Sequence, residues 1–230
     1  MERKTSQIDF WYAVNNTRVL VPPKKTLETF GNTILNYHLV SELMDVAGKV
    51  RIREGRLVAM KPLILVPDAS SLEMEGFGAQ AKEYMDWLKE NEDHIHILRY
   101  GYSLKQEAFS EQVVTDSVEN VAARVKEEVK RSDRPFDAVV LGVDDPWDVC
   151  LVRLFWVVMT KSAPENIREF ELGRRQERED GISAETRIEV ERAFSAAERD
   201  PSLTGELGKY LQKLGLFDHY QDRFFQLVRR

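Results

Sequence analysis

The stretch DAVVLGVDDPWDVCLVRLFWVVM, residues 137–159, contains the two elements that decide the expected fold. Its first part, Asp137 to Val143, is a continuous apolar run, which is typical of a strand buried on both faces of a parallel sheet. The following DDPWD favours a helix start, with Asp145 as N-cap, Pro146 as first helical residue and Asp148 as reciprocal acid. The sequence therefore predicts a strand–helix unit at the centre of the fold.

The predicted helix, roughly Trp147 to Lys161, is apolar on nearly every side. A surface helix would keep one polar face, so this helix must be covered by the sheet and by a further layer. Its Cys150 is the only cysteine of the chain, which excludes an intrachain disulfide and a zinc site built from several cysteines. We expect Cys150 to be an unreactive core thiol.

Upstream of this unit, the sequence favours strands. Ile8 to Val14 and Arg18 to Val21 predict two short strands separated by a turn. Lys49 to Val66 predicts a β-hairpin with its turn at Glu54-Gly55. Thr26 to Gly48 stays open, because its spaced aliphatic residues suit a helix while its β-branched residues suit a strand.

Helical patterns dominate the rest of the chain. Apolar spacing predicts helices near residues 79–88 and 117–132, and three short helices at 183–199, 202–214 and 218–228. Between them, the charged stretch from Arg168 to Gly181 predicts an exposed linker or a solvated helix turn.

These elements predict an α+β fold of mixed α/β character. Residues 1–66 would form a β-rich part with a hairpin, residues 79–164 a central part with βα layers around the buried helix, and residues 182–230 a helical part. Since the apolar helix needs cover on two sides, we expect one compact unit with a joint core.

Charge suggests a first functional hypothesis. The chain has 33 Lys and Arg against 39 Asp and Glu, yet residues 1–66 carry ten basic and six acidic residues. In the predicted hairpin, Lys49, Arg51 and Arg53 alternate along one strand face, and Arg56 is close in sequence. This basic hairpin predicts a binding or regulatory protein that contacts an anionic partner such as RNA. The alternative is an ordinary solvated strand face.

A second hypothesis starts from Asp144 and Asp145, which follow the predicted buried strand. Ligands of open α/β sheets bind at the carboxyl ends of strands, and paired carboxylates can hold Mg²⁺. His94 and His96 share a strand face and could join Asp144 in a zinc site. This alternative is a metal-dependent hydrolase or phosphotransfer enzyme. Otherwise Asp145 only caps the helix, and no cofactor is expected.

Several classes of function are excluded or disfavoured. The chain contains no GxxxxGK[ST] loop, no GxGxxG motif and no GxSxG elbow. It has no apolar run long enough to span a membrane, and its N-terminal residues lack the apolar region of a signal peptide, so we expect a cytoplasmic protein. Aromatic residues in Phe217 to Phe225 predict either a homodimer contact or packing of the last helix on its own part of the chain.

Overall fold

The computed structural model of the protein describes residues 10–60, 63–64, 74–91, 100–101 and 103–228. It has the α+β fold that the sequence predicts, with helices packed on a mixed sheet. The chain forms two compact units, residues 1–167 and residues 168–230. The first unit contains the sheet and the second contains only helices.

The first unit is built on a six-stranded sheet with the order β1-β8-β2-β3-β7-β5. Its strands are β1 (Arg18–Val21), β2 (Thr33–Glu42), β3 (Lys49–Ala59), β5 (Met74–Glu75), β7 (Leu104–Thr115) and β8 (Asp137–Gly142). The pairs β2–β8 and β5–β7 are parallel, and the other neighbours are antiparallel. A separate antiparallel pair joins β4 (Leu63–Ile64) to β6 (Tyr100–Gly101). The expected N-terminal and central parts therefore contribute strands to the same sheet.

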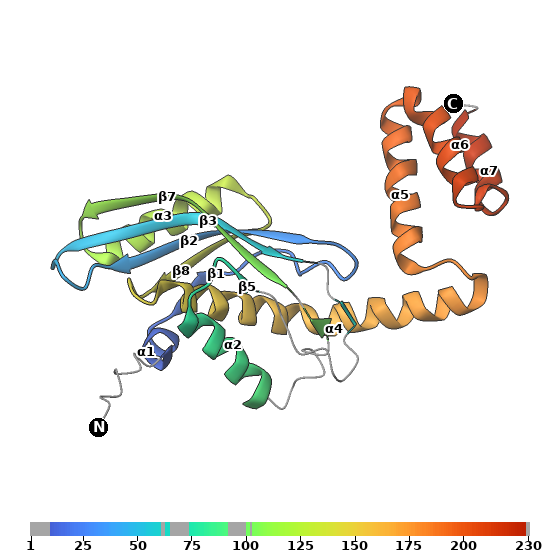
Figure 1. The fold of residues 1–230 in the computed structure, drawn as a ribbon. Coiled ribbons are helices and arrows are strands. Elements are labelled where there is room, and N and C mark those ends of the chain that lie inside the picture. Colours follow the sequence, from blue (N-terminus) through green and yellow to red (C-terminus); the bar gives the residue numbers. More distant parts are fainter. Residues whose placement is uncertain (1–9, 61–62, 65–73, 92–99, 102, 229–230) are drawn as a thin grey trace. The chain divides into compact units, whose positions relative to one another are not determined.

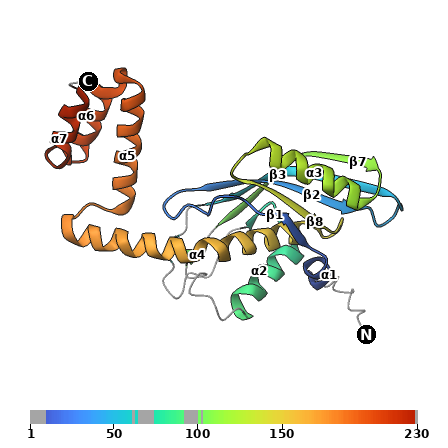
Figure 2. The same ribbon diagram turned by 180° about the vertical axis from the view of Figure 1, so that it is seen from behind.

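Helices cover the two faces of this sheet unequally (Figures 1 and 2). Helix α3 (Val118–Ser132) lies on one face, where its Val121, Ala122, Val125 and Val129 pack on strand residues of a small core. The opposite face carries α1 (Phe10–Asn15), α2 (Ala79–Asn91) and the first part of α4 (Trp147–Asp180), which enclose the larger core. The helix over residues 79–88 and the helix capped by Ser117 are confirmed.

The central strand–helix unit is also confirmed. β8 lies between β1 and β2, and its residues from Asp137 to Val140 are buried. Helix α4 begins at Trp147, as the predicted range does, but continues beyond the predicted end at Lys161 to Asp180, and Asp145 is exposed. The Asp148 carboxylate accepts a hydrogen bond from the backbone N–H of Gly78 at 2.6 Å. Asp148 therefore ties the start of α4 to the residue before α2.

The predicted first strand is wrong, because Phe10 to Asn15 form helix α1. A dense apolar run has no period that separates a strand from a buried helix turn. Tertiary contacts decide here: the ring of Phe10 lies 5.4 Å from that of Tyr84, and Trp11 lies 4.6 Å from Trp87, centroid to centroid. The second predicted strand is confirmed as β1.

The predicted turn at Glu54-Gly55 is also wrong, since β3 runs through both residues and pairs with β2 and β7 there. Gly55 is needed for a different reason: a Cβ atom would lie 2.5 Å from the hydroxyl of Tyr37 and 2.2 Å from the carbonyl oxygen of Glu107. The actual hairpin joins β2 to β3, with Gly48 at φ +74°. The basic strand is therefore central in the sheet, and the uncertain segment before it contains strand β2.

The second unit is helical, as predicted. It contains the end of α4, α5 (Ala184–Arg199), the 3₁₀ turn η1 (Pro201–Leu203), α6 (Thr204–Lys213) and α7 (Phe217–Val228). Of the two alternatives predicted for the charged stretch, the structure has helix and not a linker: residues 168–180 continue α4, because Glu, Arg and Gln favour helix.

The core of this second unit comes from its own helices. Val190 and Phe194 of α5 pack with Leu207 and Leu211 of α6 and with Tyr220 of α7. Phe217 and Phe224 pack against the same core, whereas Phe225 is 43% exposed. The homodimer contact predicted for this segment stays a prediction.

Candidate functional site

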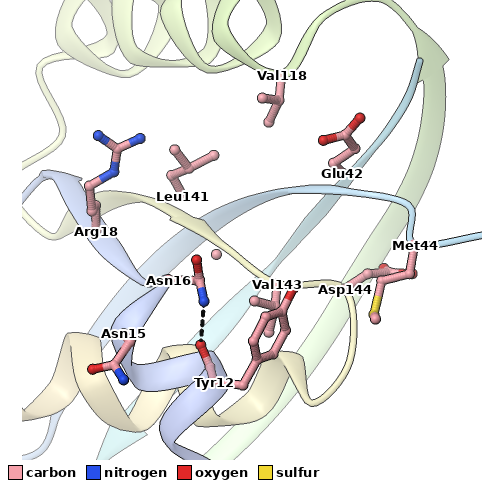
Figure 3. Close-up of a pocket in the computed structure, with 11 residues that line it drawn as sticks. Tyr12, Asn15, Asn16, Arg18, Glu42, Met44, Val118, Leu141, Val143 and Asp144 are labelled. Carbon is pink, nitrogen blue, oxygen red and sulfur yellow. Dashed lines mark hydrogen bonds between the residues drawn. The ribbon is translucent and has the colours of Figure 1, made fainter. Parts of the chain in front are cut away.

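A pocket of about 320 Å³ opens where two parallel strands end. β2 and β8 run side by side in the same direction, with Ser41 opposite Gly142, so their carboxyl ends meet at one edge of the sheet. The pocket is lined by Tyr12, Asn15, Asn16, Arg18, Glu42, Met44, Val118, Leu141, Gly142, Val143 and Asp144 (Figure 3). This is the position at which open α/β sheets bind their ligands.

The charged side chains of the pocket differ in their partners. Arg18 at the start of β1 and Glu42 at the end of β2 are both exposed. Neither forms an ion pair with another residue in the part of the chain that the structure describes. Asp144, just beyond β8, is 15% exposed and is held by two arginines. The pocket therefore offers one cation and one anion that are not already neutralised.

Arg51, Arg53, Glu111 and Asp144 form a compact cluster, the arginine network. The Arg51 Nη1 group donates to Asp144 Oδ1 at 2.7 Å and to Oδ2 at 2.9 Å, and Arg53 Nη1 lies 3.0 Å from Oδ1. On the other side, Arg51 Nε lies 3.0 Å from Glu111 Oε1, and Arg53 Nε donates to Glu111 Oε2 at 3.1 Å. The guanidinium of Arg53 stacks 5.0 Å above the Trp147 ring. Two positive and two negative charges compensate one another.

The sheet explains this arrangement. Residues directly opposite in paired strands share a face, and Arg53 pairs with Glu111 of β7. Arg51 and Arg53 point to the α4 face, where the strand end is covered by Trp147. Their side chains are only 22% and 8% exposed. The arginine network closes the end of the larger core.

The four predicted hairpin cations do not lie on one surface. Lys49 shares the α4 face with Arg51 and Arg53 and is exposed, whereas Arg56 is exposed on the opposite face, because side chains alternate along β3. The predicted alternation with Val50 and Ile52 is present, and both of these are buried under α3.

Asp144 and Asp145 have separate environments. The Asp144 oxygens already face Arg51 and Arg53, while Asp145 is exposed and makes no hydrogen bond to another described residue. Within the described ranges, no three His, Cys, Asp or Glu side chains are grouped as a metal ion would require. His94 and His96 lie outside the described residues, so the predicted zinc set is not tested.

A second polar cluster, the histidine cluster, lies on the α3 face and was not found from the sequence. His38 Nδ1 lies 2.8 Å from Glu54 Oε1, and His38 Nε2 lies 3.8 Å from Asp137 Oδ2. The Asp137 side chain is fully buried; its Oδ1 accepts a hydrogen bond from Asn36 Nδ2 at 2.7 Å, and Oδ2 lies 2.8 Å from Arg134 Nε. The parallel register of β2 and β8 places Asn36 and His38 beside Asp137, and the antiparallel register of β2 and β3 places Glu54 opposite His38.

Two buried groups, the Tyr37 hydroxyl and the Cys150 thiol, have raised pKa values. Burial raises the pKa of the Tyr37 hydroxyl, against smaller effects of its hydrogen bond with Gln106 and of the Arg53 charge. Burial likewise raises the pKa of the Cys150 thiol, which packs beneath Gly142 and has no exposed surface. Both groups are therefore held in their neutral forms, and the expected core role of Cys150 is consistent with its position.

Sequence reasoning identified Asp144 but missed its main neighbours in the pocket, Arg18 and Glu42. Arg18 begins the four-residue strand β1 and Glu42 ends the ten-residue strand β2, and neither charge belongs to a motif. β8 joins them by pairing with β1 on one side and with β2 on the other, and pairings between strands about a hundred residues apart leave no local signal.

Comparisons of the chain with protein-family models, with curated proteins and with solved structures found no match. Within the part of the chain that the structure describes, none of the helices combines the length and apolar character that crossing a membrane requires.

Proposed function

We propose that this chain is a cytoplasmic binding protein whose first unit takes up a small polar ligand in the pocket at the carboxyl ends of β2 and β8. The observation that carries the proposal is the meeting of two parallel strand ends at a pocket of about 320 Å³, with Arg18 and Glu42 left without ion-pair partners among the described residues. Pockets of a few hundred Å³ with a few convergent polar groups are typical of small-molecule sites.

The basic strand supports an anionic partner less well than the pocket supports a small ligand. Arg51 and Arg53 would have to leave Glu111 and Asp144 to contact phosphates, and Lys49 and Arg56 lie on opposite faces of the sheet. RNA binding remains testable: a filter-binding assay at low salt with single-stranded RNA would end this hypothesis if the wild-type chain shows no salt-sensitive binding.

The structure also supports the metal-dependent enzyme less well than the small-ligand pocket, because Asp144 is already paired with arginines. A cation at Asp144 would compete with two guanidinium groups for the same oxygens. Asp145 is exposed, and among the described residues no third His, Cys, Asp or Glu side chain joins these two aspartates in a metal-binding group. A thermal-shift screen with Mg²⁺, Mn²⁺ and Zn²⁺ tests this alternative, since indifference of the melting temperature to all three ions would remove it.

The pocket proposal is tested by screening the full chain against amino acids, amines, carboxylates and sugars by thermal shift. A ligand present at 100 times its Kd stabilises the folded state by about 2.7 kcal/mol, which the melting temperature reports. Hits are then located by NMR titration of the ¹⁵N-labelled chain, where we expect the amides of Glu42, Leu141 and Val143 to shift.

A matched pair of variants gives the control. Val118→Trp places a large ring at the pocket wall, whereas Gln112→Trp adds the same ring at an exposed position of β7 outside it. We expect Val118→Trp to lose the hit and Gln112→Trp to keep it, with circular dichroism confirming that both fold. Hits that shift only amides remote from the pocket, or no hit at 10 mM of any compound, would overturn the proposal.

A further inference from the structure

We propose that the ligand of the pocket carries an ammonium group and a carboxylate joined by an apolar spacer, as ω-amino acids do. This inference rests on the function proposed above and specifies its ligand class. The two charges available in the pocket, Arg18 and Glu42, have opposite signs and come from different strands. A ligand that satisfies both must itself carry two opposite charges.

The sheet register sets how far apart the backbone positions of the two charged residues lie. Arg18 of β1 is directly opposite Leu141 of β8, and Leu141 is opposite Val40 of β2. Glu42 is two residues further along β2, and thus on the same face as Val40. Neighbouring strands are about 4.8 Å apart and residues rise about 3.3 Å, so the Cα atoms of Arg18 and Glu42 are roughly 12 Å apart. Since the two side chains form no ion pair with each other, a ligand that reaches both needs a spacer between its charged groups.

Apolar side chains occupy the space between the charges. In Figure 3, Leu141 and Val118 lie between Arg18 and Glu42 and point into the pocket. Both side chains also pack against the small core under α3, so their positions are fixed by the fold. A methylene chain can cover them, whereas a hydrated polar spacer would leave them without apolar contacts.

The arginine network determines which carboxylate receives the ammonium group. Asp144 is already paired with Arg51 and Arg53, so an incoming cation gains little from it. Glu42 has no ion-pair partner among the described residues and therefore attracts the ammonium, while Arg18 receives the ligand carboxylate. Exposed ion pairs are individually weak, which makes attachment at both ends necessary for useful affinity.

The test compares ligands that differ in the distance between their ammonium and carboxylate groups. The ¹⁵N-labelled full chain is titrated with glycine, 4-aminobutyrate, 6-aminohexanoate, butylamine and butyrate, and the Kd of each is taken from amide shifts at Glu42 and Leu141. We expect one of the two longer amino acids to bind about twofold to fivefold tighter than glycine, butylamine and butyrate, as one added exposed ion pair predicts.

Two exposed variants assign the ends of the ligand. Glu42→Gln should abolish the advantage of the amino acid over butyrate, and Arg18→Gln its advantage over butylamine, while the exposed Arg131→Gln in α3 leaves both unchanged. Pocket binding of butylamine, butyrate or a neutral compound as tight as that of every amino acid would overturn this inference and leave the proposed function standing. Absence of pocket binding by all compounds, including those of the broader screen, would overturn both.

Discussion

The two faces of the central sheet are closed in different ways. On the α4 face, α1, α2 and α4 bury a large core, and the arginine network closes its end with paired charges and the Trp147 ring. On the α3 face, a single helix covers only part of the strands, and the histidine cluster lies beside it. Among the described residues, each cluster contains buried atoms without a hydrogen bond: Arg51 Nε in the arginine network, and His38 Nε2 and Asp137 Oδ2 in the histidine cluster.

The arginine network and the histidine cluster differ in how their charges are compensated. In the arginine network, both guanidinium groups lie within 3.1 Å of both carboxylates, so the four charges compensate one another without involving Arg18 or Glu42. In the histidine cluster, the buried carboxylate of Asp137 faces a single guanidinium group, that of Arg134, whose side chain is 58% exposed. The pocket lies at the sheet edge where both faces meet, with Leu141 belonging to the α3 face and Asp144 to the arginine network.

The largest expected effect concerns closure of the α4 face. Cys150 has no exposed surface, and its raised pKa favours the thiol over the reactive thiolate. Alkylation by iodoacetamide at pH 8 should therefore require unfolding and be slowed roughly 10³-fold or more in the native chain, given a stability of at least about 5 kcal/mol. Mass spectrometry with and without urea measures the ratio. Equal rates would show that this face opens readily.

The next effect tests the arginine network. Asp144→Asn removes a carboxylate that faces two largely buried guanidinium groups, so we expect a loss of about 3 kcal/mol in the free energy of unfolding. Asp145→Asn is the matched control at an exposed neighbour, with a change within about 0.5 kcal/mol. Urea denaturation measures both. Similar losses for the two variants would contradict the structural role given to Asp144.

A smaller loss in the free energy of unfolding is expected for variants of Asp137 on the α3 face. Asp137→Ala leaves the Asn36 amide without its buried acceptor, which should cost about 2 kcal/mol. Asp137→Asn retains an oxygen that can accept this hydrogen bond and should cost less. Urea denaturation compares the pair, and equal losses would show that the charge of Asp137, facing Arg134 and His38, matters more than the hydrogen bond from Asn36.

The smallest effect separates the exposed end of β3 from its buried part. Lys49→Glu changes an exposed side chain and should alter the free energy of unfolding by no more than about 0.5 kcal/mol. Arg53→Glu on the same face should cost several kcal/mol, because it places a third carboxylate beside Glu111 and Asp144 in a buried position. Thermal unfolding of the two variants at equal protein concentration makes the comparison. A large loss for Lys49→Glu would contradict its exposed placement.

Much of the fold could be predicted from local patterns. The buried strand β8, the apolar start of α4 and the cap of α3 at Ser117 each have a signal within a few residues. The structure of two regions, the Phe10 segment and the part of β3 around Gly55, could not be predicted from local patterns. The Phe10 segment is a helix because its rings pack on α2, and Gly55 is a strand residue because the Tyr37 ring needs the space above it. Both depend on residues distant in sequence.

Some features of the candidate site likewise have a local sequence signal, and others depend on residues distant in sequence. The sequence by itself determined that Asp144 follows a buried strand and that Arg51 and Arg53 share a strand face, because strand periodicity is local. Only the tertiary structure decided that these three neutralise one another with Glu111, and that Arg18 and Glu42 reach one pocket. The physical reason is that pairing between distant strands is set by packing of the whole core, which no short stretch of sequence encodes.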